Sequence, residues 1–230
     1  MKDKNQVYAK KAEHSILYRF EQKFRRFIIP KIPNFIETYH LTYLTLVFSI
    51  LLLISGFLIN DDVLLLLIIS LIVLLQWIFD VLDGGLGRYR NTGLVRWGFF
   101  ADHFLDFVFM ASVLLAYHSF LNGPADYNYL FLLIIAFSSV GLMINCYLYF
   151  GATQLFFTST NKIGTSEARL ALILFNIILI FTGKMLIIKI LPYLAIGSVL
   201  VLIYSFLKNS KRLWRLDMRL KHKDKSQRVF

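Results

Sequence analysis

The chain has 230 residues, 57% of them apolar, and a formal net charge of +11. Because the apolar residues are this frequent and fall in long blocks, the composition excludes an ordinary soluble domain and indicates a membrane protein. The length accommodates one bundle of about six membrane-spanning helices at ~20 residues each, but no second globular domain.

The first 40 residues form a basic segment that lacks the apolar core of a cleavable signal sequence, so we expect this segment to stay on the protein. Apolar residues recur at helical spacing among its lysines and arginines: Ile16, Leu17, Phe20, Phe24 and Phe27. The pattern predicts an amphipathic helix that lies on the membrane surface. A helix docked on the bundle and a simple topology signal are the alternatives.

Six apolar segments within residues 41–206 predict an all-α membrane domain of six transmembrane helices. They lie at 41–58, 63–82, 98–118, 129–150, 170–181 and 188–206. A basic tail follows at 207–230, without an aromatic-interleaved motif for nucleic acid. Its charge therefore predicts a solvated or lipid-facing end and no nucleic-acid partner.

The basic residues predict the orientation of these segments. All but two of the 25 lysines and arginines lie near the chain ends or in the turns after the second and fourth segments. The exceptions are Lys184 and Lys189, in the turn before the last segment. The positive-inside rule therefore places both termini and the two basic turns in the cytoplasm, which requires an even number of spans.

Four aspartates are grouped at the end of the second segment and the start of the third: Asp80, Asp83, Asp102 and Asp106. An ionised group at membrane depth costs roughly 2.5–3.5 kcal/mol, and such groups persist where they pair, bind ions or line a wet cavity. Four of them together should therefore have a binding partner.

Their spacing predicts two faces that can meet across a short turn. If the second helix continues past its apolar part, one face carries Asp80, Asp83, Gly84, Gly87 and Arg88. The third helix carries Gly98, Asp102 and Asp106 on one face. Both faces thus combine carboxylates with positions that have no side chain.

Carboxylate oxygens without cysteines or several histidines favour Mg²⁺ or Mn²⁺, which commonly bind carboxylates together with substrate phosphates. The glycines would admit a bulky diphosphate, and Arg88 can bind phosphate oxygens. Two alternatives remain open. Arg88, Arg90 and Arg96 could simply neutralise the aspartates while the glycines pack helices together, or the carboxylates could bind a transported cation.

The segment resembles the signature of the CDP-alcohol phosphotransferase family, D-x2-D-G-x2-A-R-x8-G-x3-D-x3-D. The matching residues are Asp80, Asp83, Gly84, Arg88, Gly98, Asp102 and Asp106. Gly87 replaces the alanine of the pattern, and one extra residue separates Arg88 from Gly98. The six predicted spans extend a looser similarity over most of the chain.

This resemblance implies that an acceptor hydroxyl attacks the β-phosphorus of a CDP-alcohol and that CMP leaves. It also implies two divalent ions and a homodimer. By position, Asp80, Asp83 and Asp102 would bind metal, while Asp106 would complete the site and accept the proton of the acceptor. The residues implied to line the CDP pocket are Gly84, Gly87, Arg88 and Gly98. His103 is an alternative base, or a helix-boundary histidine that is hydrogen-bonded to its surroundings.

The string from Gly164 to Arg169 resembles the Gly-x-Thr-Glu-x-Arg string of the amino-alcohol branch, which implies a substrate-pocket role for Glu167 and Arg169. The alternative is a plain helix start with a Thr165 or Ser166 cap. The first interpretation favours a CDP-amino-alcohol donor and a diacylglycerol-like acceptor in phospholipid synthesis. The other possible donor is CDP-diacylglycerol, with a polar acceptor such as glycerol phosphate, inositol phosphate or serine.

Overall fold

The computed structural model describes residues 16–59, 62–91, 94–121, 126–154, 159–160 and 163–227. The helices are α1 (Tyr18–Ile28), the 3-10 turn η2 (Ile29–Lys31), α2 (Thr38–Leu58), α3 (Asp62–Arg90), α4 (Val95–Phe120), α5 (Asp126–Thr153), α6 (Thr165–Thr182) and α7 (Lys184–Gln227). Two short strands, β1 (Ser159–Thr160) and β2 (Ile163–Gly164), pair antiparallel before α6. The predicted all-α class is confirmed, with this ladder as an addition.

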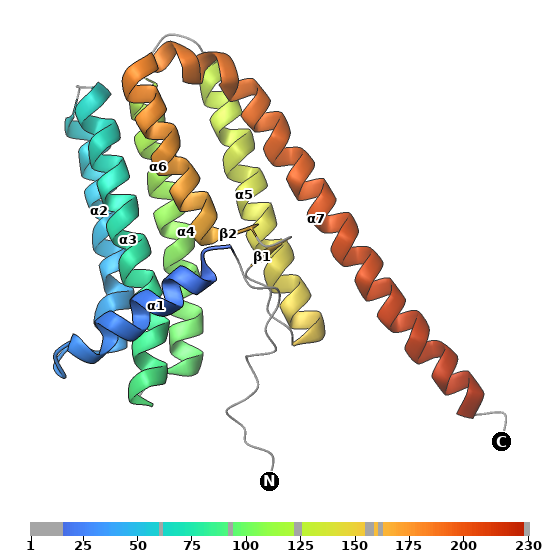
Figure 1. Ribbon diagram of the computed structural model, residues 1–230. Coiled ribbons are helices and arrows are strands. Elements are labelled where there is room, and N and C mark those ends of the chain that lie inside the picture. The colour runs from blue at the N-terminus through green and yellow to red at the C-terminus, as the bar shows by residue number, and fades with distance from the viewer. Residues whose placement is uncertain are drawn as a thin grey trace.

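Six of the helices, α2 to α7, are long and apolar enough to cross a membrane, as the sequence predicts. The chain is an integral membrane protein. Two helices continue well beyond their apolar segments, because α3 reaches Arg90 and α7 reaches Gln227. Hydropathy marks only the apolar part of a helix, whereas lysine, arginine and leucine allow the helix itself to continue. The C-terminal part of α7 extends away from the other helices (Figure 1).

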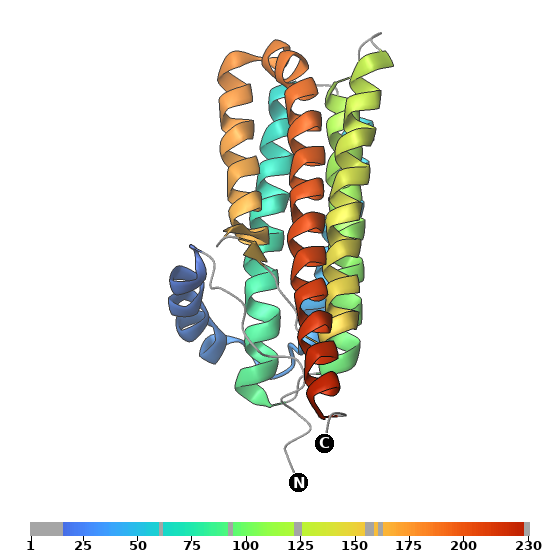
Figure 2. The same cartoon turned by 90° about the vertical axis from the view of Figure 1, so that its right-hand side faces the viewer.

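The bundle has two groups of packed helices, and the contact between α6 and α7 joins them. Helix α2 packs against α3 and α4, α6 packs against α3, and α5 lies along α7 (Figures 1 and 2). The apolar core contains fully buried side chains from α2, α3, α4, α6 and α7, including Leu52, Ile69 and Phe120. Core packing of this kind holds α3 and α4 against their common neighbour α2, which keeps the two helices of the predicted aspartate site in a fixed relation.

A buried polar chain links α3, α4 and α6 within this core. The hydroxyl of Tyr117 donates to Asn176 Oδ1, and Asn176 Nδ2 donates to Ser70 Oγ at 2.9 Å. Asn176 is completely buried, so its amide depends on these partners in place of water. The chain therefore ties α6 to the two helices that carry the aspartates.

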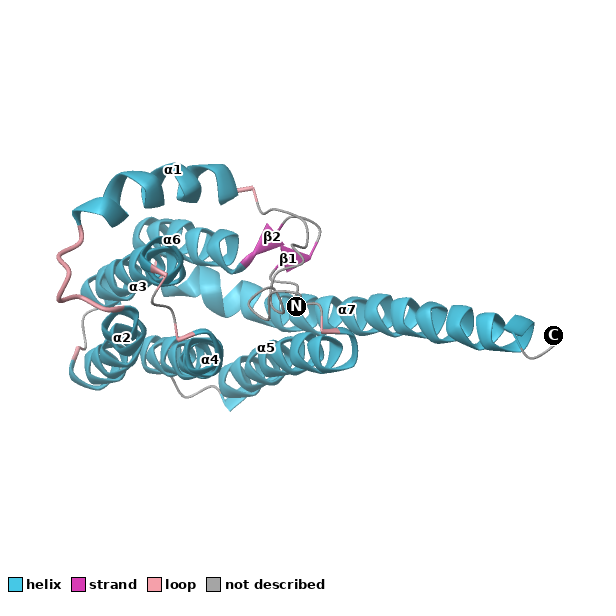
Figure 3. Cartoon of the chain, turned by 90° about the horizontal axis from the view of Figure 1, so that it is seen from below, coloured by secondary structure: helices cyan, strands magenta, loops and turns pink. Residues whose placement is uncertain are grey.

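Helix α1 crosses the outside of the bundle beside α3 and α6 (Figure 3). Its buried Glu21 accepts hydrogen bonds from Trp77 Nε1 at 3.3 Å and from Ser166 Oγ at 2.6 Å. The apolar side chains of Phe20 and Phe27 are instead more than half exposed. The predicted amphipathic helix is thus confirmed. It is docked on the bundle through Glu21 and the partly buried Phe24 and Ile28, while Phe20 and Phe27 face outward.

The connection after α1 is also fastened to the bundle. Arg90, at the end of α3, donates to the carbonyl oxygens of Ile36 at 2.6 Å, Ile32 at 2.8 Å and Pro33 at 3.0 Å. One guanidinium therefore holds most of the segment between η2 and α2. The last turn of α3 sets the position of that segment.

Candidate active site

Three of the four predicted aspartates converge between α3 and α4. Asp80 of α3 and Asp102 and Asp106 of α4 each offer a carboxylate oxygen, and these atoms lie within 4.8 Å of one another. Asp102 and Asp106 share a face of α4 because they are four residues apart. All three side chains are partly buried.

Arg169 of α6 closes this group from a third helix. Its Nη1 donates to Asp80 Oδ2 at 2.6 Å, and its Nη2 donates to Asp106 Oδ1 at 3.0 Å. The Arg169 side chain is only 11% exposed, so these charge-assisted bonds lie away from bulk water. The resemblance placed Arg169 in a substrate pocket, whereas the structure places its guanidinium directly on two of the predicted metal ligands.

Asp83 lies one turn beyond Asp80 and turns toward α2. Its Oδ2 accepts a hydrogen bond of 2.5 Å from Thr42 Oγ1. Thr42 is buried and was not predicted as a site residue. The only sequence signal for it was a threonine in the first span, with no spacing rule that connects it to the aspartates. A carboxylate has two oxygens, so the bond from Thr42 leaves the other able to bind a metal ion.

The predicted CDP-pocket residues extend from the aspartates along α3 and α4. The Arg88 guanidinium lies over Gly84, where an added Cβ would be 3.5 Å from Arg88 Nη1. Gly87 is buried in the same turn. A Cβ added at Gly98 would meet no atom of the described residues within 4 Å. Space next to the carboxylates is therefore open on the α4 side.

His103 is adjacent to the cluster but packs toward α5. Its ring is stacked on Phe99 with 4.3 Å between ring centroids, and the ring of Tyr147 lies 5.8 Å away. His103 Nδ1 is 3.4 Å from Asp102 Oδ2. These contacts match a histidine held by its surroundings, and its role as an alternative base stays a prediction.

Glu167 caps the start of α6. Its Oε2 accepts from the Gly164 backbone N–H at 2.8 Å, and its Oε1 accepts from the Leu17 N–H at 2.9 Å. Glu167 in the first turn agrees with the helix-start interpretation, but the predicted cap was wrong, because the N-cap residue is Gly164 and the Ser166 hydroxyl donates to Glu21. The Glu167 carboxylate also holds the chain just before α1, which the sequence did not predict.

Gln76 is a further residue at this site that the sequence analysis did not identify. It lies one turn before Asp80 on α3 and is 1% exposed. Its side chain lies close to Asp106, and among the described residues its amide atoms have no hydrogen-bond partner. A fully buried polar side chain next to Asp106 thus forms part of the inner wall of the site.

The donor set fits a hard divalent cation. Three carboxylates face a single guanidinium, so negative charge is in excess at the cluster. The ligand atoms are all oxygens, which is the set that Mg²⁺ and Mn²⁺ prefer. The site can therefore bind a cation and, through it, the phosphates of a substrate.

The comparison with known families bears directly on this site. The family model described as CDP-alcohol phosphatidyltransferase matches residues 31–207. The chain belongs to this family. The match contains the four aspartates of the signature and begins after α1. The comparisons with curated proteins and with solved structures found no match.

Family membership gives the chain a general activity. A CDP-alcohol phosphatidyltransferase transfers a phosphoalcohol group from a CDP-alcohol in phospholipid synthesis. Three of the four aspartates of the signature, Asp80, Asp102 and Asp106, lie close enough together to hold a metal ion. The chemistry of the donor and of the acceptor is a separate question.

Proposed function

We propose that this protein is a divalent-metal-dependent enzyme that transfers the phosphoalcohol of a CDP-alcohol to an acceptor hydroxyl, with release of CMP. The observation that carries this proposal is the set of three carboxylate oxygens within 4.8 Å of one another, contributed by two helices of a chain in this family. Such a set suits a diphosphate substrate, because each phosphate brings negative charge that only cations can balance.

The metal ligands in this proposal are Asp80, Asp83, Asp102 and Asp106, which would hold one or, as the resemblance implies, two Mg²⁺ or Mn²⁺ ions. When bound, such ions neutralise a diphosphate and stabilise the CMP leaving group. The protein's own contribution is to hold the carboxylates. Arg169 does so for Asp80 and Asp106, and Thr42 does so for Asp83.

Asp106 is the proposed general base. It accepts the proton of the acceptor hydroxyl while the oxygen forms a bond to the β-phosphorus and the bond from that phosphorus to the CMP oxygen breaks. Its Oδ1 is bound by Arg169, so Oδ2 is the oxygen available for the proton. His103 is a weaker candidate because its ring is stacked on Phe99.

The CDP group is proposed to lie along Gly84, Gly87, Arg88 and Gly98. The open surroundings of Gly98 support this placement, since a ligand there meets no Cβ. Arg88 offers donors to the phosphates, as guanidinium groups commonly do. Glu167 has two backbone partners, so its part in the pocket is limited to positioning α6.

For the donor we retain CDP-amino-alcohol, with a diacylglycerol-like acceptor, as the first candidate, and CDP-diacylglycerol with a polar acceptor as the second. The two are separated by incubating purified protein with radiolabelled CDP-donors and lipid extracts in Mg²⁺ and measuring CMP and labelled lipid. Release of CMP from only one class of donor identifies that class as the substrate. The absence of CMP with every donor and acceptor, together with cation flux in vesicles, would replace the enzyme by a cation transporter.

We also propose that both termini and the active site face the cytoplasm and that the protein is a homodimer. The basic residues support the orientation, because they gather at the end that carries the aspartates. Labelling of single cysteines placed in the C-terminal tail, in a Cys146→Ser background, tests the orientation in intact cells and in inverted vesicles. Light scattering of the detergent-solubilised protein tests the dimer.

A further inference from the structure

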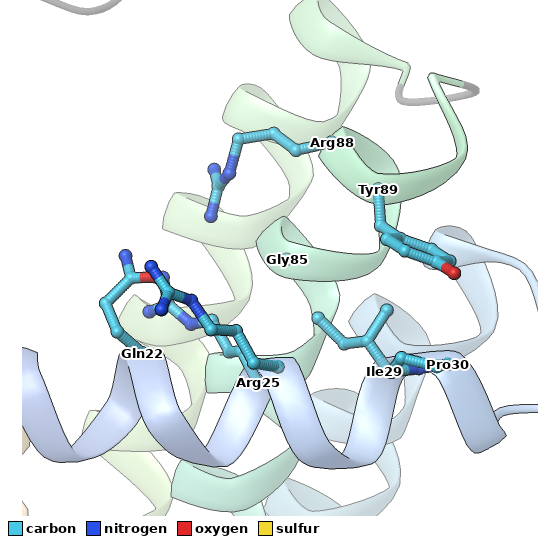
Figure 4. A pocket seen from close by; sticks show the side chains of 8 residues that line it. Gln22, Arg25, Ile29, Pro30, Gly85, Arg88 and Tyr89 are labelled. Carbon is cyan, nitrogen blue, oxygen red and sulfur yellow. The ribbon is translucent and has the colours of Figure 1, made fainter.

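A cavity of about 250 Å³ lies between α1 and the last turns of α3, apart from the carboxylate cluster. Gln22, Arg25 and Arg26 line it from α1, and Gly85 and Arg88 line it from α3 (Figure 4). Helix α1 precedes the residues matched by the family model. Five of the eight residues that line the cavity therefore belong to a segment that the family match does not include.

The cavity is strongly basic. Of the described residues that line it, three are arginines and none is acidic. Arg88 is also within electrostatic range of Arg25 on one side and of Asp83 on the other. Like charges held this close repel each other, so the arrangement favours an anion between them.

Two of these arginines have donors to spare. A guanidinium carries five N–H donors. Arg25 uses one of them in a long 3.4 Å contact with Glu21, whose carboxylate already accepts from Trp77 and Ser166. Within the described chain, the buried Arg25 Nε has no hydrogen-bond partner, and Arg88 takes part in no hydrogen bond or ion pair. Buried donors normally have an acceptor, and none of the described residues supplies one to Arg25 Nε, so this donor is available to a bound anion.

The packing of α1 keeps the two guanidinium groups facing the same space. At Gly85, an added Cβ would lie 3.2 Å from Arg25 Cδ and 2.5 Å from Ile29 Cδ1, so α1 approaches α3 directly over this glycine. Figure 4 shows Arg25 with Gln22 reaching in from α1 and Arg88 reaching in from α3. The buried Glu21 anchors α1 in this position.

We propose that this cavity binds a phosphate group, held between Arg25 and Arg88 with the amide of Gln22 as a further donor. Phosphate matches the fork of a guanidinium, which can donate two parallel bonds to its oxygens. The cavity is smaller than the ~300–1,000 Å³ of sites for drug-sized ligands, so it fits a phosphate with a small substituent and excludes a whole CDP-alcohol.

Two sources could supply this phosphate, namely a water-soluble phosphate ester and the headgroup of an anionic lipid. The exposed Phe20 and Phe27 place α1 at the bilayer surface, within reach of headgroups. Arg88 is also one of the residues proposed to line the CDP pocket, so a phosphate bound here would share its guanidinium with that pocket. The binding site itself does not depend on the proposed transfer reaction.

The test uses the full-length protein purified in neutral detergent with EDTA, so that no metal ion contributes to phosphate binding. In one arm, radiolabelled inorganic phosphate is titrated by equilibrium dialysis. In the other, the protein in nanodiscs of phosphatidylcholine, with and without phosphatidic acid, is analysed by native mass spectrometry for retained phosphatidic acid. Each arm compares the wild type with Arg25→Gln, Arg25→Lys and the matched control Arg19→Gln.

Arg19 is exposed on the same helix and does not line the cavity, so Arg19→Gln makes the same charge change outside the site. We expect saturable binding that Arg25→Gln weakens by at least about tenfold and that Arg25→Lys partly restores, with Arg19→Gln within about twofold of the wild type. Binding of free phosphate assigns a soluble ester, and retention of phosphatidic acid alone assigns a lipid headgroup.

The proposal is wrong if the wild type binds neither probe, or if Arg25→Gln and Arg19→Gln bind equally well. Wild-type binding is measured directly, so the test does not depend on the folding of a variant. Release of CMP from CDP-donors is measured separately with Mg²⁺. A protein that binds phosphate but releases no CMP would overturn the transfer proposal alone. A protein that releases CMP but binds no phosphate would overturn the phosphate-site proposal alone.

Discussion

Arg169 Nη1 lies 2.6 Å from Asp80 Oδ2, so a side chain of α6 reaches a carboxylate on α3. The same guanidinium also bonds Asp106 on α4. One arginine thus connects the three helices that form the site. Both of its partners are residues that are proposed to bind metal. Its charge limits the repulsion between these carboxylates.

Replacing Arg169 by lysine should reduce turnover by about tenfold or more, because an ammonium group cannot reproduce the planar fork that holds two carboxylates at once. The measurement is the rate of CMP release at saturating donor. Arg19→Lys is the matched control, since Arg19 is exposed on α1. An Arg169→Lys enzyme as fast as the control would show that the guanidinium does not position the site.

Asp106→Asn should abolish turnover while leaving CDP binding largely intact. The amide is close in size to the carboxylate and can still accept from Arg169, but it cannot take up the proton of the acceptor. CMP release and binding of labelled CDP are measured side by side. Asp62→Asn, at the opposite end of α3, serves as the control. Normal turnover in Asp106→Asn would remove Asp106 from the role of base.

Thr42→Val should raise the Mg²⁺ concentration needed for half-maximal activity by about tenfold, because the hydroxyl that orients Asp83 is lost while the shape is kept. A Mg²⁺ titration of CMP release gives this value. Thr182→Val removes a hydroxyl bonded to a backbone carbonyl at the far end of α6 and should change nothing. Equal Mg²⁺ requirements in the two variants would count against Asp83 as a metal ligand.

Gly85→Ala should loosen α1 and lower the free energy of unfolding by about 1–3 kcal/mol, since its Cβ would lie 2.5 Å from Ile29 Cδ1. Faster tryptic cleavage at Arg25 or Arg26 and a lower melting temperature would report the change. Gly197→Ala, where an added Cβ meets no described atom within 4 Å, is the control. If both variants resist trypsin like the wild type, α1 is not held by its contact with Gly85.

Removal of divalent metal with EDTA should stop CMP release, and Mg²⁺ or Mn²⁺ should restore it. The reason is that the carboxylate cluster alone would repel a diphosphate. Activity is measured before chelation, after dialysis and after each ion is added back. Full activity in the dialysed, metal-free protein would contradict the proposed cofactor.

The sequence predicted those features that depend on local spacing. Asp102 and Asp106 are one turn apart, so their common face followed directly from helical geometry. The helix ends were less predictable, because α3 and α7 continue through polar residues that hydropathy does not score as membrane-spanning. The spacing of apolar residues therefore does not predict the residue at which such a helix ends.

Contacts between distant segments could not be predicted in this way. Asp83 is offset from Asp80 around α3, which brings it to Thr42 of α2 and away from the group of three carboxylates. Arg169 was suggested by a short string, but its partners on two other helices depend on how α6 packs. Likewise, the sequence left open whether α1 lies on the membrane surface or docks on the bundle, and the hydrogen bonds of the buried Glu21 show that it docks.

Asn176 and Arg169 lie seven residues apart on α6, which is nearly two full turns, so they point in almost the same direction. The hydrogen bonds of Asn176 to Tyr117 and Ser70 therefore fix the orientation of the whole helix relative to its neighbours. They resist rotation of α6 about its axis and a slip of one turn, about 5.4 Å, along it. The direction in which the Arg169 guanidinium points is thus determined by hydrogen bonds deep in the apolar core, far from any substrate.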